Sequence, residues 1–535
     1  MSEKVDALLS QYEMLEREKR PKENLMKDIC PYVSPTRAVN TSVDGNPDEQ
    51  HYNEDIFDGK AVDAARKMTD GIFGNACSPV SNWAEMRSEE ERHNNQLDKY
   101  LRVQSGKMLR HFSRTNFYTS IYQYINDGVT LGNAAMLTRG KGSKVSFKAL
   151  NPFHWFFSED DYGDMRTFIY RYPMTAMEAK LSLTKVSKEV EDEAKDNPTA
   201  KRWYLFIILE QDAAAALNGL KVKKAKPYQL YITELKGSEI LYEGAYNTNP
   251  VNIWLYRKNS GEKYGRGPGD DAFQDLMYAN QLSMSLLEGT QLRAAPPMRA
   301  PQEMKAYGLD YSPKGVNWYV NPERQPEFMQ VGGEYMASTD LLDRRDRVIE
   351  YHFMVDFWTM LSRSTTRQTA YEVSEKQGER LALIAYVIQN FFSSMQGILE
   401  RTFDVGVDQN IFDRPSSFAK GADVRYVFNG FLAQAQRRAV EGQGELQALN
   451  EVFPIFEIDP NAAIVLNTEK YVRKRFEVNN VDSELLHTEQ EVAKIKENMA
   501  AKAQAQQQNE QITEAGKASK DAGFKDIMNV MGGGQ

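Results

Sequence analysis

The sequence predicts an α+β fold that is mainly helical. Two groups of short aromatic and β-branched runs in the first half are typical of antiparallel strands. The second half instead repeats apolar residues at the helical period over long segments, which Gly- and Pro-rich breaks separate. With 535 residues, of which 41% are hydrophobic and 26% charged, the composition is that of a globular protein with several packed layers or domains.

The N-terminal region is expected to be helical with loops between the helices. Residues 4–30 place apolar side chains at helical spacing, with an interruption at Pro21. Residues 31–55 are rich in Pro, Asn, Asp, Ser and Thr and predict a loop. Further helices are expected over 58–73, ending at Gly74 and Asn75, and over 95–114 and 118–128.

The two β groups cover residues 133–172 and 203–256. The first holds the runs AAMLT, VSFKAL, HWFF and FIYRY and predicts an antiparallel sheet. A helix over 176–196 precedes the second group, so this half is a sheet flanked by helices. Within the first group, Arg139–Lys144 (RGKGSK) has the wrong spacing for a phosphate-binding loop and is interpreted as a basic turn between strands.

The second half predicts long helices with one excursion between them. The break GRGPGDDAF (265–273) offers an N-cap at Gly269–Asp271, and the helix that follows runs to about 293. Residues 296–334 form a Pro-rich excursion; helices over 335–358 and 370–405 flank the polar segment 359–369. A strand over 424–428 and helices over 431–452 and 460–476 come before a polar, Gln-rich tail from about 483, which is either disordered or helical only in an assembly.

Sequence signals for catalysis, metals and membranes are weak. No Walker motif or nucleophile elbow is present, so no cofactor and no enzymatic activity are expected. The acids 159–161 suit a hairpin turn, and His51 with its neighbouring acids suits a solvated loop better than a metal site. The net charge of -9 argues against tight binding to DNA phosphates. The longest apolar stretch, 381–388, is too short for a membrane span. A charged N-terminus and only two cysteines, Cys30 and Cys77, predict a cytoplasmic protein.

Six segments, in chain order, resemble the head-to-tail connector family of short-tailed phages. They are AARKMTDGIFGNACSPVSNWAEM (64–86), NDGVTLGNAAMLTRG (126–140), the aromatic strand and acidic hairpin 151–179, YGRGPGDDAFQDLMYANQL (264–282), QTAYEVSEKQGERLALIAYVIQNF (368–391) and GFLAQAQRRAVEG (430–442). The resemblance spans about residues 5–480. Gly267 departs from the small hydroxyl residue usual in the YGR-x-P motif, and the C-terminal tail resembles nothing specific.

The resemblance implies a portal fold with its usual division into parts. A wing covers 1–265, stem helices cover 266–295 and 335–358, and a clip covers 296–334. The chain continues with a tunnel loop (359–369) and a tunnel helix (370–405). It ends with wing or crown helices (406–482) and a C-terminal barrel or disordered tail (483–535).

The resemblance also implies function, partners and location. We expect a homo-oligomeric ring, typically of twelve subunits, at one capsid vertex of the virion, assembled in the host cytoplasm. Double-stranded DNA would pass through it without sequence readout. The expected protein partners are the terminase large subunit, then tail adaptor or nozzle proteins, and the major capsid and scaffolding proteins. Other classes stay open: a tail adaptor or internal ejection protein and, with least support, a DNA-processing enzyme.

Three sets of residues are candidates for these contacts. In the clip, Arg299, Lys305, Lys314 and Arg324 would dock the terminase or adaptor; the alternative is a long surface loop. In the stem, Asp343, Arg344, Arg345 and Arg347 would pair between subunits or contact DNA phosphate in the channel, and their mixed charges favour pairing; the alternative is a solvated helix face. In the tunnel loop, Arg363, Ser364, Thr365, Thr366 and Arg367 would line the DNA channel or simply connect two helices. Finally, Trp83, Trp155, Trp254 and Trp358 are interpreted as core or interface anchors.

Overall fold

The computed structural model divides the chain into two compact units, 1–436 and 437–535. The structure describes residues 3–35, 37, 55–88, 95–183, 185–217, 220, 222–223, 225–300, 302, 305, 308, 310, 323, 327–329, 335–362, 370–414, 424–430, 432–433, 467, 471–472, 492, 494–499 and 501–502. The fold below is that of the first unit. The predicted helices over 431–452 and 460–476 and the tail from 483 lie almost entirely outside the described residues.

Four helices precede the sheets: α1 (Glu3–Val33), α2 (Lys60–Ala76), α3 (Asn95–Phe112) and α4 (Phe117–Leu131). The predicted interruption of the first helix is wrong, because α1 continues through Pro21 and Pro31. Both halves of α1, before and after Pro21, are packed against other elements. The first half buries Leu8 against the larger sheet, and the second half buries Met26 in the main core.

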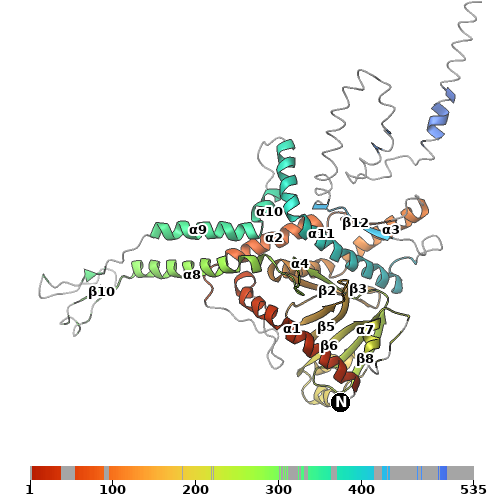
Figure 1. Ribbon diagram of the computed structural model, residues 1–535, viewed down its shortest axis with the longest axis horizontal. Helices are drawn as coiled ribbons and strands as arrows, with labels where there is room; N and C mark the ends of the chain where they lie inside the picture. Colours follow the sequence, from red (N-terminus) through yellow and green to blue (C-terminus); the bar gives the residue numbers. More distant parts are fainter. Residues whose placement is uncertain are drawn as a thin grey trace, which may run out of the picture. The chain divides into compact units, whose positions relative to one another are not determined.

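The strands form two larger antiparallel sheets rather than one (Figure 1). The three-stranded sheet has the order β3-β2-β9, from β2 (Asn133–Lys141), β3 (Lys144–Leu150) and β9 (Val251–Leu255). The five-stranded sheet has the order β4-β5-β6-β7-β8. Its members are β4 (Trp155–Glu159), β5 (Met165–Thr175), β6 (Lys201–Glu210), β7 (Tyr228–Glu234) and β8 (Ile240–Tyr246). The single sheet expected over 133–172 therefore divides after Leu150, and apolar side chains from both sheets share one cluster.

Four short elements correct the sequence-based assignment. The helix expected over 176–196 is two helices, α5 (Ala176–Ser182) and α6 (Lys188–Asp196), because Leu183 is extended and Ser187 caps a new helix start. A short helix, α7 (Gln211–Ala216), follows β6. Strand β1 (Ala84–Ser88), which was not predicted, pairs with the predicted strand β12 (Val424–Phe428).

The second half of the unit is helical, as predicted. Helix α8 (Pro268–Ala294) and helix α9 (Tyr335–His352) flank the short pairing of β10 (Met298–Arg299) with β11 (Glu327–Phe328). The helix expected over 335–358 breaks after α9, and α10 (Val355–Ser362) follows the break. Helix α11 (Ala370–Asp408) is the longest, and it packs on β9 and β2 of the three-stranded sheet.

The main core joins α1, α2, α4 and α11 to the three-stranded sheet. Trp83 lies at its far end, stacked with Phe112, Phe117 and Phe428 at centroid distances of 6.0, 6.0 and 6.5 Å. All four tryptophans predicted as anchors are buried: Trp83, Trp155, Trp254 and Trp358.

Candidate assembly surfaces

The start of α8 is held against the end of α4 by a contact between glycine backbones. Gly132 ends α4 with φ 72, and a Cβ added there would lie 2.3 Å from the amide nitrogen of Gly267. The buried Asn133 side chain closes this contact: it accepts from the amide of Gly265 at 2.8 Å and donates to the Gly265 carbonyl at 3.0 Å. These contacts fix the direction in which α8 leaves the sheet.

The first turn of α8 is anchored by charge. Gly267, rather than the predicted Gly269–Asp271, is the N-cap, and its amide donates to the Asp270 carboxylate at 2.8 Å. Lys22 of α1 pairs with the same carboxylate at 2.5 Å, and Arg257 donates to both oxygens of Asp271 at 2.6 and 2.8 Å. Carboxylates at a helix N-terminus are favourable because the helix dipole is positive there.

Helices α8 and α9 lie side by side, and we call this pair the arm (Figure 1). Arg345 donates to Asp275 at 2.7 Å, and its guanidinium lies 5.0 Å from the ring centroid of Tyr278. Lys60 of α2 pairs with Glu350 at 2.6 Å on α9. Near the core, α9 is therefore joined both to α8 and to α2.

Three of the four predicted stem residues lie on the exposed face of α9. Asp343, Arg344 and Arg347 are exposed, whereas Arg345 makes its ion pair within the chain. No ion pair to another described residue is found for Asp343, Arg344 or Arg347. Contacts of these residues with a second subunit stay a prediction, and for Arg345 such a contact would compete with Asp275.

The outer half of α8 has no buried residue. Ala279 is the last buried position of the helix, and from 280 to 294 each side chain is exposed or half-buried. Leu287 and Leu292 are 46% and 45% exposed. Apolar side chains left open on a helix that projects from its core are typical of a surface covered in an assembly.

Helix α10 is attached to the core through Trp358. Met354 joins α9 to α10 with φ 52, a left-handed conformation that sharply redirects the chain. The Trp358 ring lies directly on Gly71 of α2, where an added Cβ would be 2.3 Å from the ring. The indole N–H has no hydrogen-bond partner among the described residues, so apolar contact alone holds this ring.

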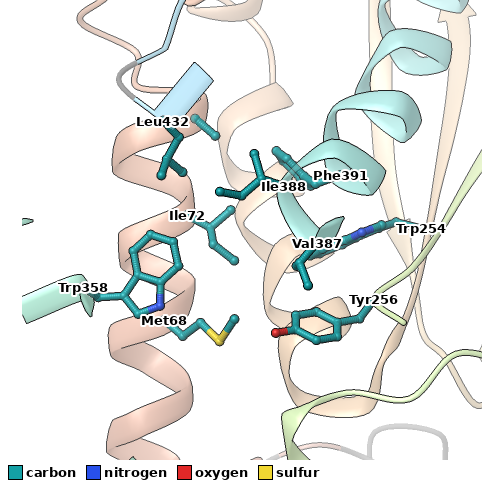
Figure 2. A pocket seen from close by; sticks show the side chains of 10 residues that line it. Met68, Ile72, Trp254, Tyr256, Trp358, Val387, Ile388, Phe391 and Leu432 are labelled. Carbon is teal, nitrogen blue, oxygen red and sulfur yellow. The ribbon is translucent and has the colours of Figure 1, made fainter. Parts of the chain in front are cut away.

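A small apolar cavity lies beside Trp358 (Figure 2). Its volume of about 10 Å³ is roughly the space of one water molecule. Met68 and Ile72 of α2 line one side, and Val387 and Ile388 of α11 line another. The described chain before and after the predicted tunnel loop thus meets at the same apolar cavity.

Beyond this cavity, α11 is fastened to the three-stranded sheet. The ring of Phe391 meets Trp254 edge-on at 5.0 Å. Ten residues further along α11, the buried Arg401 donates to the Thr248 hydroxyl at 2.9 Å and to Asp404 at 3.1 Å. Its guanidinium also lies 4.6 Å from the centroid of Tyr246. The C-terminal half of α11 is therefore a fixed support for the segment before it.

The remaining predicted residues are placed only in part. Arg299 and Lys305 of the predicted clip are exposed. Lys314 and Arg324, and all five predicted channel residues, lie outside the described residues; the five are Arg363, Ser364, Thr365, Thr366 and Arg367.

Sequence reasoning missed the residues that hold these surfaces in place. Asp275, Gly71 and Arg401 received no role, although each contacts a predicted element. Gly71 interrupts a helical pattern, which is a signal for close packing. The partners of Asp275 and Arg401 are far away in sequence, so no local pattern could have identified them.

Among the described residues, no three His, Cys, Asp or Glu side chains converge as they would around a metal ion. Within the same ranges, no helix has the length and apolar character that crossing a bilayer requires.

Comparisons with known proteins agree with one another. A family model described as bacteriophage head to tail connecting protein matches residues 5–486. The chain is 22% identical over 515 residues to a protein of Bordetella phage BPP-1 named probable portal protein, which covers 94% of this chain and 92% of that relative. It is also 22% identical over 516 residues to the portal protein of Salmonella phage epsilon15, with the same coverage of both chains.

Proposed function

The chain belongs to the bacteriophage head to tail connecting protein family, and we propose that it works as the portal of a tailed phage. In this role it forms a ring at one capsid vertex, through which double-stranded DNA enters and later leaves the head. The observation that carries the proposal is the family match over residues 5–486, joined by two relatives named as portal proteins across nearly their whole length.

Ring formation is assigned to the arm. Its helices α8 (268–294) and α9 (335–352) fall within the predicted stem segments 266–295 and 335–358. Asp343, Arg344 and Arg347 offer charges of both signs on one face, and Leu287 and Leu292 offer open apolar surface. A neighbouring copy of the chain would cover both, as closed homo-oligomers do. Twelve subunits is the number that the resemblance to portals implies.

The clip, 296–334, is assigned to docking. Its described cations Arg299 and Lys305 are exposed, and we assign Lys314 and Arg324 to the same surface. The terminase large subunit would bind here during packaging, and tail adaptor or nozzle proteins would bind afterwards. Both partners would thus use one surface in turn.

The channel is assigned to the segment between α10 and α11. Arg363 and Arg367 would contact phosphates weakly, and Ser364, Thr365 and Thr366 would add hydroxyl contacts without reading bases. A ring of twelve chains at -9 each would carry a charge on the order of -100, partly screened by salt beyond about 10 Å. Such a ring repels DNA overall, so the duplex can slide.

The family is one of structural virion components, and no catalytic step is assigned to this chain. The wing, 1–265, together with 406–482, would contact the major capsid and scaffolding proteins during assembly in the host cytoplasm. The C-terminal segment 483–535 would form a crown or barrel in the ring.

Gold labelling of intact virions tests the location. An antibody against this chain, applied to gently opened particles, is expected to label one vertex per head, the one that carries the tail. Antibody against the major capsid protein serves as the control and should label the whole shell. Labels spread over all vertices, or along the tail alone, would rule out the portal assignment.

A further inference from the structure

The β2–β3 hairpin gathers positive charge on one face. In the antiparallel register, Lys141 pairs with Lys144, Arg139 pairs with Ser146 and Leu137 pairs with Lys148. Directly paired residues point to the same side of a sheet, as do residues two apart on one strand. Arg139, Lys144 and Lys148 therefore share one face, and the hairpin has no acidic residue between 139 and 148; we call this the cationic hairpin face.

The described cations of this face are exposed and lack ion pairs. Arg139, Lys144 and Lys148 are exposed, and none makes an ion pair with another described residue. Glu178 acts on Lys148 from a distance, but its carboxylate accepts from the amide of Thr175 at 3.0 Å in a helix capping box. Partial desolvation lowers the pKa of Lys148, and repulsion from Arg139 lowers it further.

This arrangement opposes the stability of the hairpin. Like charges at neighbouring positions of paired strands repel one another, and Arg139 lies diagonally across from both Lys144 and Lys148. Most cations elsewhere around the two sheets have partners: Lys258 pairs with Glu159, and Arg202 pairs with Glu234 at 2.6 Å. A local arrangement that costs stability, with no ion-pair partner in the described part of the chain, is typical of a functional surface.

The chemistry of the face favours phosphate over protein. Its exposed residues are cations, Gly142, Ser143 and Ser146, and no large apolar side chain of the hairpin is exposed. Protein interfaces depend on buried aromatic or apolar anchors, whereas Arg, Lys, Ser and backbone amides are the usual phosphate contacts. Aromatic rings of the five-stranded sheet contact two of these cations. The Arg139 guanidinium lies 5.5 Å from the ring centroid of Phe206, and the Lys148 ammonium lies 5.5 Å from the ring centroid of Tyr170.

We propose that the cationic hairpin face binds the phosphate backbone of double-stranded DNA without reading its sequence. The proposal goes beyond the channel, because the hairpin belongs to the sheet region and not to the predicted tunnel loop. It rests on the proposed function only for the presence of DNA. A local cationic face in an acidic protein would hold DNA at one place while the rest of the surface repels it.

Fluorescence anisotropy with a short labelled duplex tests this in the full chain, from about 50 to about 200 mM salt. The variant carries Arg139→Gln, Lys144→Gln and Lys148→Gln. The matched control carries Lys188→Gln, Lys223→Gln and Lys226→Gln, which removes the same charge elsewhere in the wing. We expect the hairpin variant to bind at least about tenfold more weakly at low salt, with a salt slope smaller by about 2–3 units, and the control to change by less than about twofold.

Three results would overturn the proposal. Equal losses in variant and control would mean that binding follows net charge alone, and absence of binding by the unmodified chain at low salt would remove the observation itself. If labelled polyglutamate binds and depends on the hairpin while DNA does not, the partner is an acidic protein. Mass photometry of both variants distinguishes these outcomes from failure of the portal function, because rings of the expected mass would show that assembly is intact while DNA binding is lost.

Discussion

His154 shows at the scale of a residue how burial sets charge. Its side chain is 5% exposed and lies against Trp203 with a centroid distance of 5.5 Å. Burial, with smaller contributions from the nearby charges of Arg171 and Lys19, lowers the pKa of His154 to about 3. The imidazole is therefore neutral in the folded wing, although in the unfolded chain it would take up a proton near pH 6.5.

This difference predicts a loss of stability in acid. A lowered histidine pKa in the folded state leaves stability intact above about pH 6.5 and removes it progressively as the pH falls toward 3. The contribution is about 1 kcal/mol per pH unit in this window. Unfolding midpoints between pH 7.5 and 5 measure it, and His154→Gln should flatten the slope. An unchanged slope in His154→Gln would contradict the burial argument, whatever the absolute stability of the variant.

Lys19 marks the limit of sequence reasoning at this scale. It is 1% exposed and donates to the carbonyls of Pro152 and Trp155, both at 2.5 Å, beneath aromatic rings. In the sequence it lies in a charged stretch of α1 and resembles a solvated lysine. Its acceptors are backbone atoms more than a hundred residues away, so local composition and spacing could not predict them.

At the scale of elements, α10 packs on α2 through the contact between Trp358 and Gly71. A side chain at Gly71 would overlap the ring of Trp358, so Gly71→Ala must displace α10 or the ring. We expect a loss of about 1–3 kcal/mol, as for other overpacked cores. Hydrogen exchange of α10 and the unfolding midpoint measure this effect together.

Gly74→Ala is the matched control on the same helix. Nothing lies within 4 Å of a Cβ at Gly74, and alanine favours helix over glycine by about 1 kcal/mol. This variant should be neutral or more stable. If Gly71→Ala is equally harmless and exchange in α10 stays unchanged, Trp358 does not hold the helix.

Periodicity identified the long helices and most strands because their apolar residues repeat along one face. It failed where contacts between segments far apart in the sequence determine the local backbone conformation. The break at Met354 follows an uninterrupted helical pattern, and β1 has no strand signature until it pairs with β12, more than three hundred residues later. The α5–α6 break was visible in principle, since Ser187 is a strong cap.

At the scale of the whole molecule, the exposed face of α9 should govern assembly. Arg344→Glu with Arg347→Glu reverses two cations that have no ion pair to the described chain. Each interface would lose about 1 kcal/mol, repeated around the ring, so the ring fraction should fall several-fold. Mass photometry at fixed concentration measures this fraction.

Lys223→Glu with Lys226→Glu makes the same charge change in the wing and should leave assembly intact. Equal losses would point to overall charge, and no loss in the α9 variant would leave its face solvated, the alternative that the sequence also allowed. Asp343, Arg344 and Arg347 are exposed on α9, and their contact with a second subunit stays a prediction. The sequence could not separate Arg345 from them, because the partner Asp275 belongs to the other helix of the arm.

The most direct test of the central claim is negative-stain electron microscopy of the purified chain, with mass photometry of the same sample. The account predicts rings with a central hole and a mass near twelve times the 61.1 kDa of one chain. A chain that stays monomeric alone, and also when co-expressed with its capsid and scaffolding proteins, would contradict it.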